Sequence, residues 1–266
     1  MAVRKSKKLR SDIILVETDR ITTHGLDLCR DILGKVSLGD MAFFQITGRM
    51  PTAQESTVFN AITVTLVEHG MTPSAIVARM TYVGSPEAMQ AAIAAGLLGM
   101  GSTMVGAMEN AARMLQEAIP DPKKKIDFDA LAREVVAKYA ARGETIRGIG
   151  HHFHKPLDPR APRLFEIARA NGLGGPYVQL MEAISKCASE GAPEPLPVNA
   201  PGAIGAISSE LKLPWQIVRG IGVMSRSIGL IAHICEEVKD PMTREIQFRV
   251  EEEATEHLRA AKQKNG

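Results

Sequence analysis

Signals for the start and the end of helices recur along the chain, and they constrain its fold more than any other feature. Thr52 is followed three residues later by Glu55, which is the capping-box pattern of a helix N-terminus. Gly70 supplies a stop after the apolar residues that recur as far as His69. Similar signals predict helices that begin at Ser37 with Asp40, at Thr72-Pro73, at Ser85-Pro86 and at Asp127 or Asp129, with stops at Gly48 and Gly143.

Signals for β-strands are nearly absent. Alternating apolar and polar residues and two-residue hairpin turns are rare, whereas alanine-rich turns such as residues 91–95 have a high helix propensity. The 266 residues, 45% of them hydrophobic, are enough to bury a core as one large domain or two unequal ones. We therefore predict an all-α fold.

Composition argues against several classes of protein. The net charge is only +2 and aromatic residues make up 4% of the chain, so little is available to bind phosphates or stack on bases, and no nucleic-acid partner is expected. The three cysteines are widely spaced and odd in number, which predicts neither a disulfide framework nor a zinc site and fits a cytoplasmic protein. No apolar segment approaches the length of a membrane span, so no membrane association is expected.

One segment, GIGHHFHKPLDPR at residues 148–160, contains many side chains that can bind a ligand or take part in catalysis. Two glycines and two prolines in so short a stretch exclude a regular helix and predict a rigid loop. Such a mixture of close backbone approach, titratable rings and fixed cations suits an anionic small molecule rather than a metal. The imidazoles and cations of the loop are those of His151, His152, His154, Lys155 and Arg160.

The order Gly-x-Gly-His, a basic residue and Asp-Pro-Arg resembles the adenine-recognition and catalytic loop of citrate synthases and citryl-CoA lyases. Residues 198–204 (VNAPGAI) resemble the family's segment with the catalytic aspartate. Residues 224–237 (MSRSIGLIAHICEE) resemble the late helix whose arginine holds a substrate carboxylate. Residues 38–40, 47–51 and 68–70 match the N-terminal half of the family, so the resemblance covers most of a short, lyase-like chain.

The resemblance implies a citrate synthase-like helical fold in which a small domain is inserted into a large one. The large, dimerisation domain is then formed by residues 1–105 and 200–266, and the small domain, with the CoA-binding loop 148–160, by residues 106–199. Members of this family are dimers, so a homodimer or a higher homo-oligomer is expected. 

The family's reaction joins or splits a carbon–carbon bond between an acetyl-CoA-type thioester and a 2-oxo acid, for example citryl-CoA into acetyl-CoA and oxaloacetate. The resemblance thus implies no permanently bound cofactor: a CoA thioester is a substrate, and a di- or tricarboxylate is the other ligand. His151 matches the catalytic histidine, and the expected CoA contacts come from Gly148, Gly150, His154 and Lys155. The expected acid contacts come from His69, Arg160 and Arg226; alternatively, His69 is a helix C-cap and the two arginines form structural ion pairs.

Three positions depart from the family pattern. Met104 stands where a histidine is expected, and Asn199 stands in place of the aspartate, which matters more because an amide cannot exchange a proton with carbon at neutral pH. His152 replaces the usual arginine. If the chain is a lyase or synthase of this type, His152, His154 or a water held by Asn199 must replace the lost acid. Two alternatives stay open: a CoA-thioester enzyme of another substrate or reaction class, and a catalytically degenerate protein that binds CoA or polycarboxylates.

Overall fold

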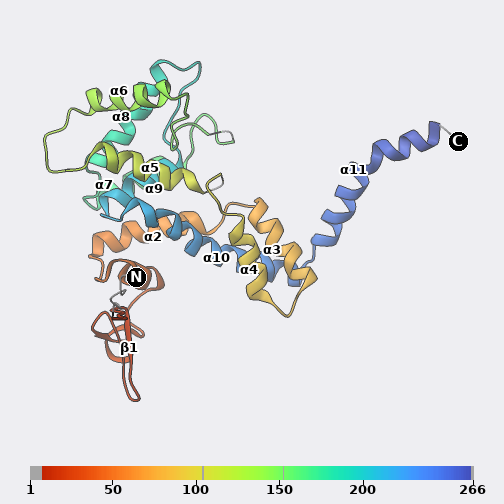
Figure 1. The fold of residues 1–266 in the computed structure, drawn as a ribbon, viewed down its shortest axis with the longest axis horizontal. Coiled ribbons are helices and arrows are strands. Elements are labelled where there is room, and N and C mark those ends of the chain that lie inside the picture. The colour runs from red at the N-terminus through yellow and green to blue at the C-terminus, as the bar shows by residue number, and fades with distance from the viewer. Residues whose placement is uncertain (1–7, 104, 152, 265–266) are drawn as a thin grey trace, which may run out of the picture.

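A computed structural model describes residues 8–103, 105–151 and 153–264, with side chains as far as residue 260, and the described chain is predominantly helical (Figure 1). The all-α prediction is confirmed, with one small addition. Three short antiparallel strands near the N-terminus form a sheet in the order β1-β2-β3, in which Ile14 pairs with Thr23 and Thr23 with Leu26. The strands are β1 Ile14–Val16, β2 Ile21–Thr23 and β3 Leu26–Asp27, followed by a π-helical turn, η1, Leu28–Ile32.

The helices that follow are α1 Leu38–Thr47, α2 Ala53–Val67, α3 Pro73–Gly84, α4 Met89–Leu98, α5 Gly106–Ala118, α6 Phe128–Ala141, α7 Arg160–Ala170, α8 Pro176–Glu190, α9 Ala200–Glu210, α10 Trp215–Lys239 and α11 Thr243–Lys264. Most of the predicted starts are confirmed by cap geometry. Ser37 and Asp127 accept hydrogen bonds from the first turns of α1 and α6, and Thr52 and Glu55 form the complete capping box of α2. Gly48 ends α1 in the left-handed conformation that glycine adopts without strain.

The predicted helix start at Ser85-Pro86 is wrong, since α4 begins only at Met89. The backbone N–H of Ser85 donates instead to Thr81 and Tyr82, and therefore caps the C-terminus of the preceding helix α3. A turn closed by the bond from Ala88 N–H to the Ser85 carbonyl then separates the two helices. In the sequence alone, a serine that ends one helix cannot be told from a serine that begins the next.

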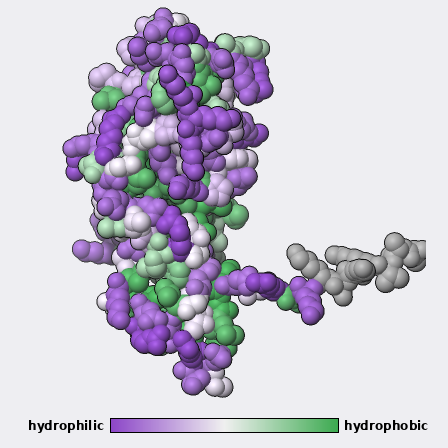
Figure 2. All heavy atoms as spheres, turned by 90° about the vertical axis from the view of Figure 1, so that its left-hand side faces the viewer, coloured by the Kyte–Doolittle hydropathy of each residue, from purple (hydrophilic) through white to green (hydrophobic). Residues whose placement is uncertain are grey.

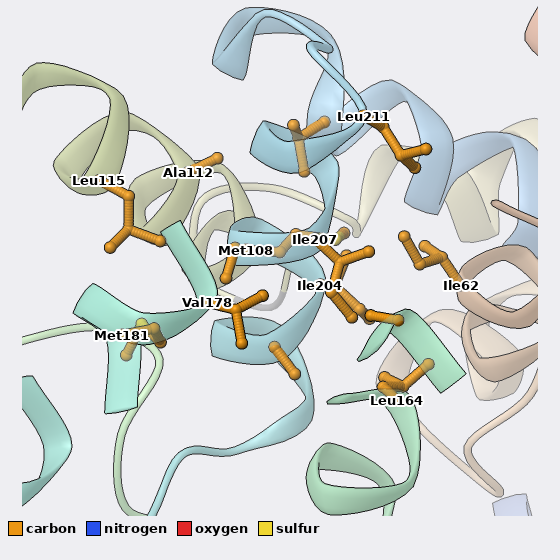
Figure 3. Close-up of a cluster of buried hydrophobic side chains, with 14 of the residues drawn as sticks. Ile62, Met108, Ala112, Leu115, Leu164, Val178, Met181, Ile204, Ile207 and Leu211 are labelled. Atoms are coloured by element: carbon orange, nitrogen blue, oxygen red, sulfur yellow. The ribbon is translucent and has the colours of Figure 1, made fainter. Parts of the chain in front are cut away.

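The core is built around α9, whose residues are almost all buried between α5, α7 and α8. Figure 3 shows Ile204 and Ile207 of α9 in the middle of side chains from other helices, such as Met108 of α5, Val178 of α8 and Ile62 of α2. Gly205 of α9 allows this approach, because an added Cβ would lie 2.8 Å from the backbone of α5. The N-terminus of α9 is thereby held in a fixed position.

The long helix α10 is apolar enough, by length and composition alone, to cross a membrane. The expectation that no segment reaches this length is therefore wrong. The helix packs against α2, α3, α4, α5 and α9. Its residues Ile221, Leu230 and Ile234 are buried, whereas Ile228, Ile231 and Val238 are exposed. The core helix of a globular domain has the same composition as a membrane span, which explains the result.

A buried ion pair joins α3 to α10. The guanidinium of Arg79 is fully buried and lies against the carboxylates of Glu236 and Glu237, at 3.0 Å from the latter, and against Nδ1 of His233. Glu237 also accepts the backbone N–H of Thr243, the first residue of α11. One network therefore fixes three helices close to the segment that carries His69.

The predicted division into domains stays a prediction. Its boundary at residues 199 and 200 passes through the start of α9, and this helix packs closely on α5, α7 and α8 of the proposed small domain. The surface in Figure 2 is mainly hydrophilic, with hydrophobic side chains gathered in the middle and lower parts of the view. Near the N-terminus, the exposed apolar residues include Ile14, Leu15 and Val16 of β1.

Candidate active site

The glycine-framed loop is fixed directly on the N-terminus of α9. Gly148 and Gly150 have φ values of 102° and 65°, a region that side chains other than glycine rarely adopt. Gly150 N–H donates to the Pro197 carbonyl at 2.8 Å, and the Gly148 carbonyl accepts from Asn199 N–H at 3.0 Å. A Cβ on Gly202 would lie 2.1 Å from the Gly148 oxygen, so the two backbones touch. The predicted loop is present, and none of its described residues, 148–151 and 153–159, is helical before α7 begins at Arg160.

Asn199 holds this junction together. Its Oδ1 accepts the N–H of Gly202 at 3.0 Å and caps α9, and its Nδ2 donates to the Gly150 carbonyl at 2.6 Å. The side chain is buried. Both heteroatoms therefore make structural hydrogen bonds, and the assignment of Asn199 to catalysis stays a prediction.

The orientation of His151 is set by the loop's own backbone. Its Nδ1 accepts the N–H groups of Phe153 and His154 at 3.0 and 2.9 Å. Because an acceptor nitrogen carries no proton, the neutral ring has its proton on Nε2. In the neutral ring, Nε2 of His151 is therefore the nitrogen that can donate a hydrogen bond.

Three of the predicted histidines come together. The ring of His154 lies 4.6 Å from that of His151 and 5.7 Å from that of His69, centroid to centroid. Nε2 of His154 is buried and has no hydrogen-bond partner among the described residues. An unsatisfied buried nitrogen costs about 1–3 kcal/mol, a penalty that a ligand can remove. The structure therefore joins residues 69, 151 and 154 into one cluster.

Asp158 and Arg160 form a close pair beside this cluster. Nε and one terminal nitrogen of Arg160 donate to the buried Asp158 carboxylate at 3.0 and 2.9 Å, and Ala200 N–H donates to it at 2.9 Å. Burial raises the pKa of Asp158, but the hydrogen bonds from Arg160 and Ala200 outweigh it and lower the pKa to about 2. The structural ion pair considered for Arg160 is thus present, and its guanidinium, 27% exposed, still reaches the site.

Arg226 lies on the other side, where α10 meets the α2–α3 connection. It donates to the Leu66 carbonyl and to Thr72 Oγ1, both at 3.3 Å. Burial lowers the pKa of Arg226, while the nearby carboxylate of Glu68 raises it. Glu68 accepts the N–H of His69 at 2.7 Å and lies 3.1 Å from Nε2 of His233, so this turn is tied to α10.

The surroundings of His69 favour the neutral form of its imidazole. Burial lowers its pKa first, and the positive charges of Arg160, His154 and Arg226 lower it further, while Asp158 raises it. The two arginines therefore act on the same imidazole from different helices. Their combined potential favours an anion beside the cluster.

A cavity of about 500 Å³ opens on the cluster. The residues that line it are Gly150, His151, His154, Lys155, Pro156, Glu194, Pro195, Leu196 and Pro197. Lys155 points to Glu194, with 2.6 Å between Nζ and the carboxylate oxygen, and this exposed contact can exchange for a phosphate. Gly148 lies behind the lining, against α9, so of the predicted CoA contacts the cavity unites Gly150, His154 and Lys155.

The histidine cluster also meets the spacing of a metal site. One nitrogen from each of His69, His151 and His154 lies within 4.8 Å of the others, whereas three nitrogens on one zinc ion lie about 3.4 Å apart. The rings would have to close around an ion beside Arg160 and Arg226, whose charges oppose a dication. The electrostatics thus favour an anionic ligand with hydrogen-bond acceptors.

Sequence reasoning missed residues whose partners lie far along the chain. Asp158 was visible only as part of Asp-Pro-Arg, and its contact with Ala200 depends on the fold. The roles of His233 and Arg79 have no local signal, because they face Glu68 and Glu237 across helices. Met104 and His152 lie outside the described residues.

Comparisons with known proteins identify the family to which this fold belongs. The family model "Citrate synthase, C-terminal domain" matches residues 16–249. The structure of citryl-CoA lyase from Hydrogenobacter thermophilus superposes with a TM-score of 0.78 and 30% identity, covering 88% of each chain. The structure of ATP citrate lyase from Methanothrix soehngenii, in complex with citrate and coenzyme A, gives 0.71 at 23% identity and covers 89% of this chain and 40% of that one.

Among curated sequences, the citrate synthase of Haloferax volcanii is 26% identical over 200 residues, which are 74% of this chain and 50% of that protein. The chain thus spans about half the length of the curated relatives it matches. The family model, in contrast, covers nearly all of the described chain. The chain therefore belongs to the citrate synthase family.

Proposed function

We propose that this protein cleaves or forms a carbon–carbon bond between an acetyl-CoA-type thioester and a 2-oxo acid, with citryl-CoA, acetyl-CoA and oxaloacetate as the reactants. The observation that carries the proposal is the cluster of three imidazoles, two of which line one cavity, together with the charges of Arg160 and Arg226 that act on the third, His69. The similarity to the citryl-CoA lyase of H. thermophilus, which covers 88% of both chains, supports the cleavage direction.

The CoA part of the substrate occupies the cavity beside the loop. Gly150 gives its backbone to the cavity wall, and Lys155 can leave Glu194 for a phosphate oxygen. The cavity wall of prolines and Leu196 suits the adenine or the pantetheine arm. The ATP citrate lyase structure that resembles this chain holds coenzyme A and citrate together, which is consistent with two adjoining subsites.

The acid part binds at the cations. Arg226 and Arg160 lie on α10 and α7 and both act on the pKa of His69, so each can hold a separate carboxylate near this histidine. His151 then donates from Nε2 to the central oxygen, which is a hydroxyl in citryl-CoA and a carbonyl in oxaloacetate. Its donor tautomer stabilises negative charge on that oxygen as the carbon–carbon bond breaks.

The test is direct incubation with citryl-CoA, with acetyl-CoA measured by chromatography and oxaloacetate by a coupled dehydrogenase. We expect both products in equal amounts. Thermal unfolding with CoA and with citrate added separately should show stabilisation by each.

Binding of both ligands without any turnover would instead support the catalytically degenerate binding protein, an alternative favoured by the structural hydrogen bonds of Asn199. Stabilisation by neither ligand would contradict the proposal altogether. We also propose that the protein forms a homodimer and that it lies in the cytoplasm.

A further inference from the structure

His154 is the central member of the histidine cluster. It is also the member to which the proposed function assigns no role. Its ring stands between those of His151 and His69, and its backbone N–H donates to Nδ1 of His151. It lines the CoA cavity, whereas His69 lies outside that lining, on the side of Arg226. His154 is thus placed where the thioester end and the acid end of one substrate meet.

Cleavage of a tertiary alcohol needs a base, and two groups at the loop, His151 and Asn199, are poorly suited to that role. His151 already has both backbone donors on Nδ1, so its neutral ring offers a proton from Nε2 rather than accepting one. Asn199 is an amide whose two heteroatoms hold the loop and α9. Nε2 of His154, in contrast, is a buried ring nitrogen without a hydrogen-bond partner among the described residues.

We infer that His154 is the acid–base residue of this site. Its imidazole takes the proton of the substrate's tertiary hydroxyl, the C–O bond becomes a carbonyl, and the bond to the thioester α-carbon breaks. The electron pair of that bond moves into the thioester to give an enolate. The imidazolium then returns its proton to the α-carbon, so one proton moves from oxygen to carbon and the neutral ring is restored. Bond formation is the reverse.

This inference rests on the proposed function and adds to it the residue that carries the proton. The same three imidazoles could be read as a metal site, in which the metal would replace the base by lowering the pKa of the alcohol. The positive charges of Arg160 and Arg226, which both reach His69, oppose a dication and favour the carboxylates of a substrate. Proton transfer by His154 needs no further component.

The experiment compares His154→Gln with His257→Gln, a change in an exposed histidine of α11. Single-turnover cleavage of citryl-CoA in D₂O gives the rate and the deuterium content of the acetyl-CoA methyl group. We expect His154→Gln to slow cleavage on the order of 10²–10⁴-fold and His257→Gln to leave it unchanged. Binding of CoA and of citrate should stay within about threefold in both, because glutamine can still hydrogen-bond to a ligand but cannot exchange a proton with it.

A second variant guards against misfolding. His154→Ala should be equally slow and should regain rate when free imidazole is added, which a merely structural residue would not show. A rate for His154→Gln within about threefold of the unaltered protein would overturn the inference while leaving the proposed function intact. If the purified protein contained stoichiometric zinc and His154→Gln did not, the histidines would be a metal site and the inferred acid–base role of His154 would be wrong. No cleavage by the unaltered protein would remove both the inference and the proposed function.

Discussion

Asp158 shows how much of the site depends on a single residue. The buried carboxylate accepts from the side chain of Arg160 and from the backbone of Ala200, so it fixes a cation of the site to the start of α9. Arg160 can only donate hydrogen bonds, and the carboxylate supplies the acceptors that define its orientation. The ion pair therefore fixes the orientation of a guanidinium that stays 27% exposed.

The lowered pKa of Asp158 predicts a specific dependence of stability on pH. The pKa falls from 3.8 to about 2 on folding, so the folded state binds this proton less tightly than the unfolded state. The resulting stabilisation is present above pH 4 and is lost as the pH falls towards 2, and it amounts to about 2 kcal/mol. Between pH 5 and pH 2, the free energy of unfolding should therefore decrease by about 2 kcal/mol less in Asp158→Asn than in the unaltered protein, as measured by urea titration. Parallel pH profiles would contradict this.

Asn199 makes a second prediction at the residue scale. Asn199→Asp keeps the cap on α9 but places a carboxylate oxygen where Nδ2 lay, 2.6 Å from the Gly150 carbonyl. We expect a loss of about 1–3 kcal/mol in the free energy of unfolding, from an unmade hydrogen bond and repulsion between two acceptors. Asn199→Ser, which keeps a capping hydroxyl without that repulsion, should lose less. Equal stability of Asn199→Asp and the unaltered protein would show that the loop moves freely.

Arg226 tests the division between the two subsites. Arg226→Lys keeps the charge but loses the forked donors that now reach Leu66 and Thr72. We expect binding of citrate to weaken tenfold or more, about 1.4 kcal/mol, and binding of CoA to change by less than about twofold, both measured by calorimetry. Lys186→Arg, on α8, is a control for a change between the same residue types. Equal weakening for both ligands would contradict the assignment.

The sequence predicted which residues of the loop lie together better than it predicted their contacts with distant segments. Spacing within the loop indicated His151, His154 and Arg160, because these residues share one short segment. It could not show that His154 lies beside His69, since the two are separated by several helices. Nor could it show the contact of Asp158 with Ala200, 42 residues away. Long-range contacts of this kind arise from packing, for which a single sequence holds no direct signal.

At the scale of the helices, the predictions that succeeded were those whose physics is local. The capping box of α2 and the serine cap of α1 lie within four residues, so the sequence shows both partners at once. The start of α4 was predicted wrongly because Ser85 bonds backwards to α3. The small sheet β1–β3 was missed because its strands are only two or three residues long.

Two glycines in helices allow a matched test of close packing. A Cβ at Gly202 of α9 would collide with the Gly148 backbone, whereas a Cβ at Gly220 of α10 would meet nothing within 4 Å. We expect Gly202→Ala to destabilise the fold by about 1–3 kcal/mol through overpacking and to weaken CoA binding, because the loop is pushed away. Gly220→Ala should stabilise by about 0.5–1 kcal/mol, since alanine is the better helix former. Thermal unfolding measures both, and a tolerated Gly202→Ala would refute the close contact.

At the scale of the whole molecule, α11 is the element that a single chain leaves least supported. It extends away from the body of the molecule (Figure 1), and it exposes 66% of Phe248, 59% of Val250 and 56% of Leu258. Its start packs on α3, whose own outer side exposes Val77 and Met80. An isolated helix is only marginally stable in water, so a helix of this length with exposed apolar residues is expected to bury them against another surface.

We expect that surface to belong to a second copy of this chain, as in the homodimer proposed above. A two-fold interface would let α11 of each copy cover the exposed side chains of the other, and each buried leucine or phenylalanine would contribute about 1.5–3 kcal/mol to association. Sedimentation equilibrium should give about twice the 28.7 kDa of one chain. Changing Phe248 and Leu258 together to serine should then weaken association at least a hundredfold, while Glu252→Ser, an exposed polar residue of the same helix, should not. If the unaltered protein were a monomer, or if the double change left the association of the dimer unaffected, these residues would contact another partner.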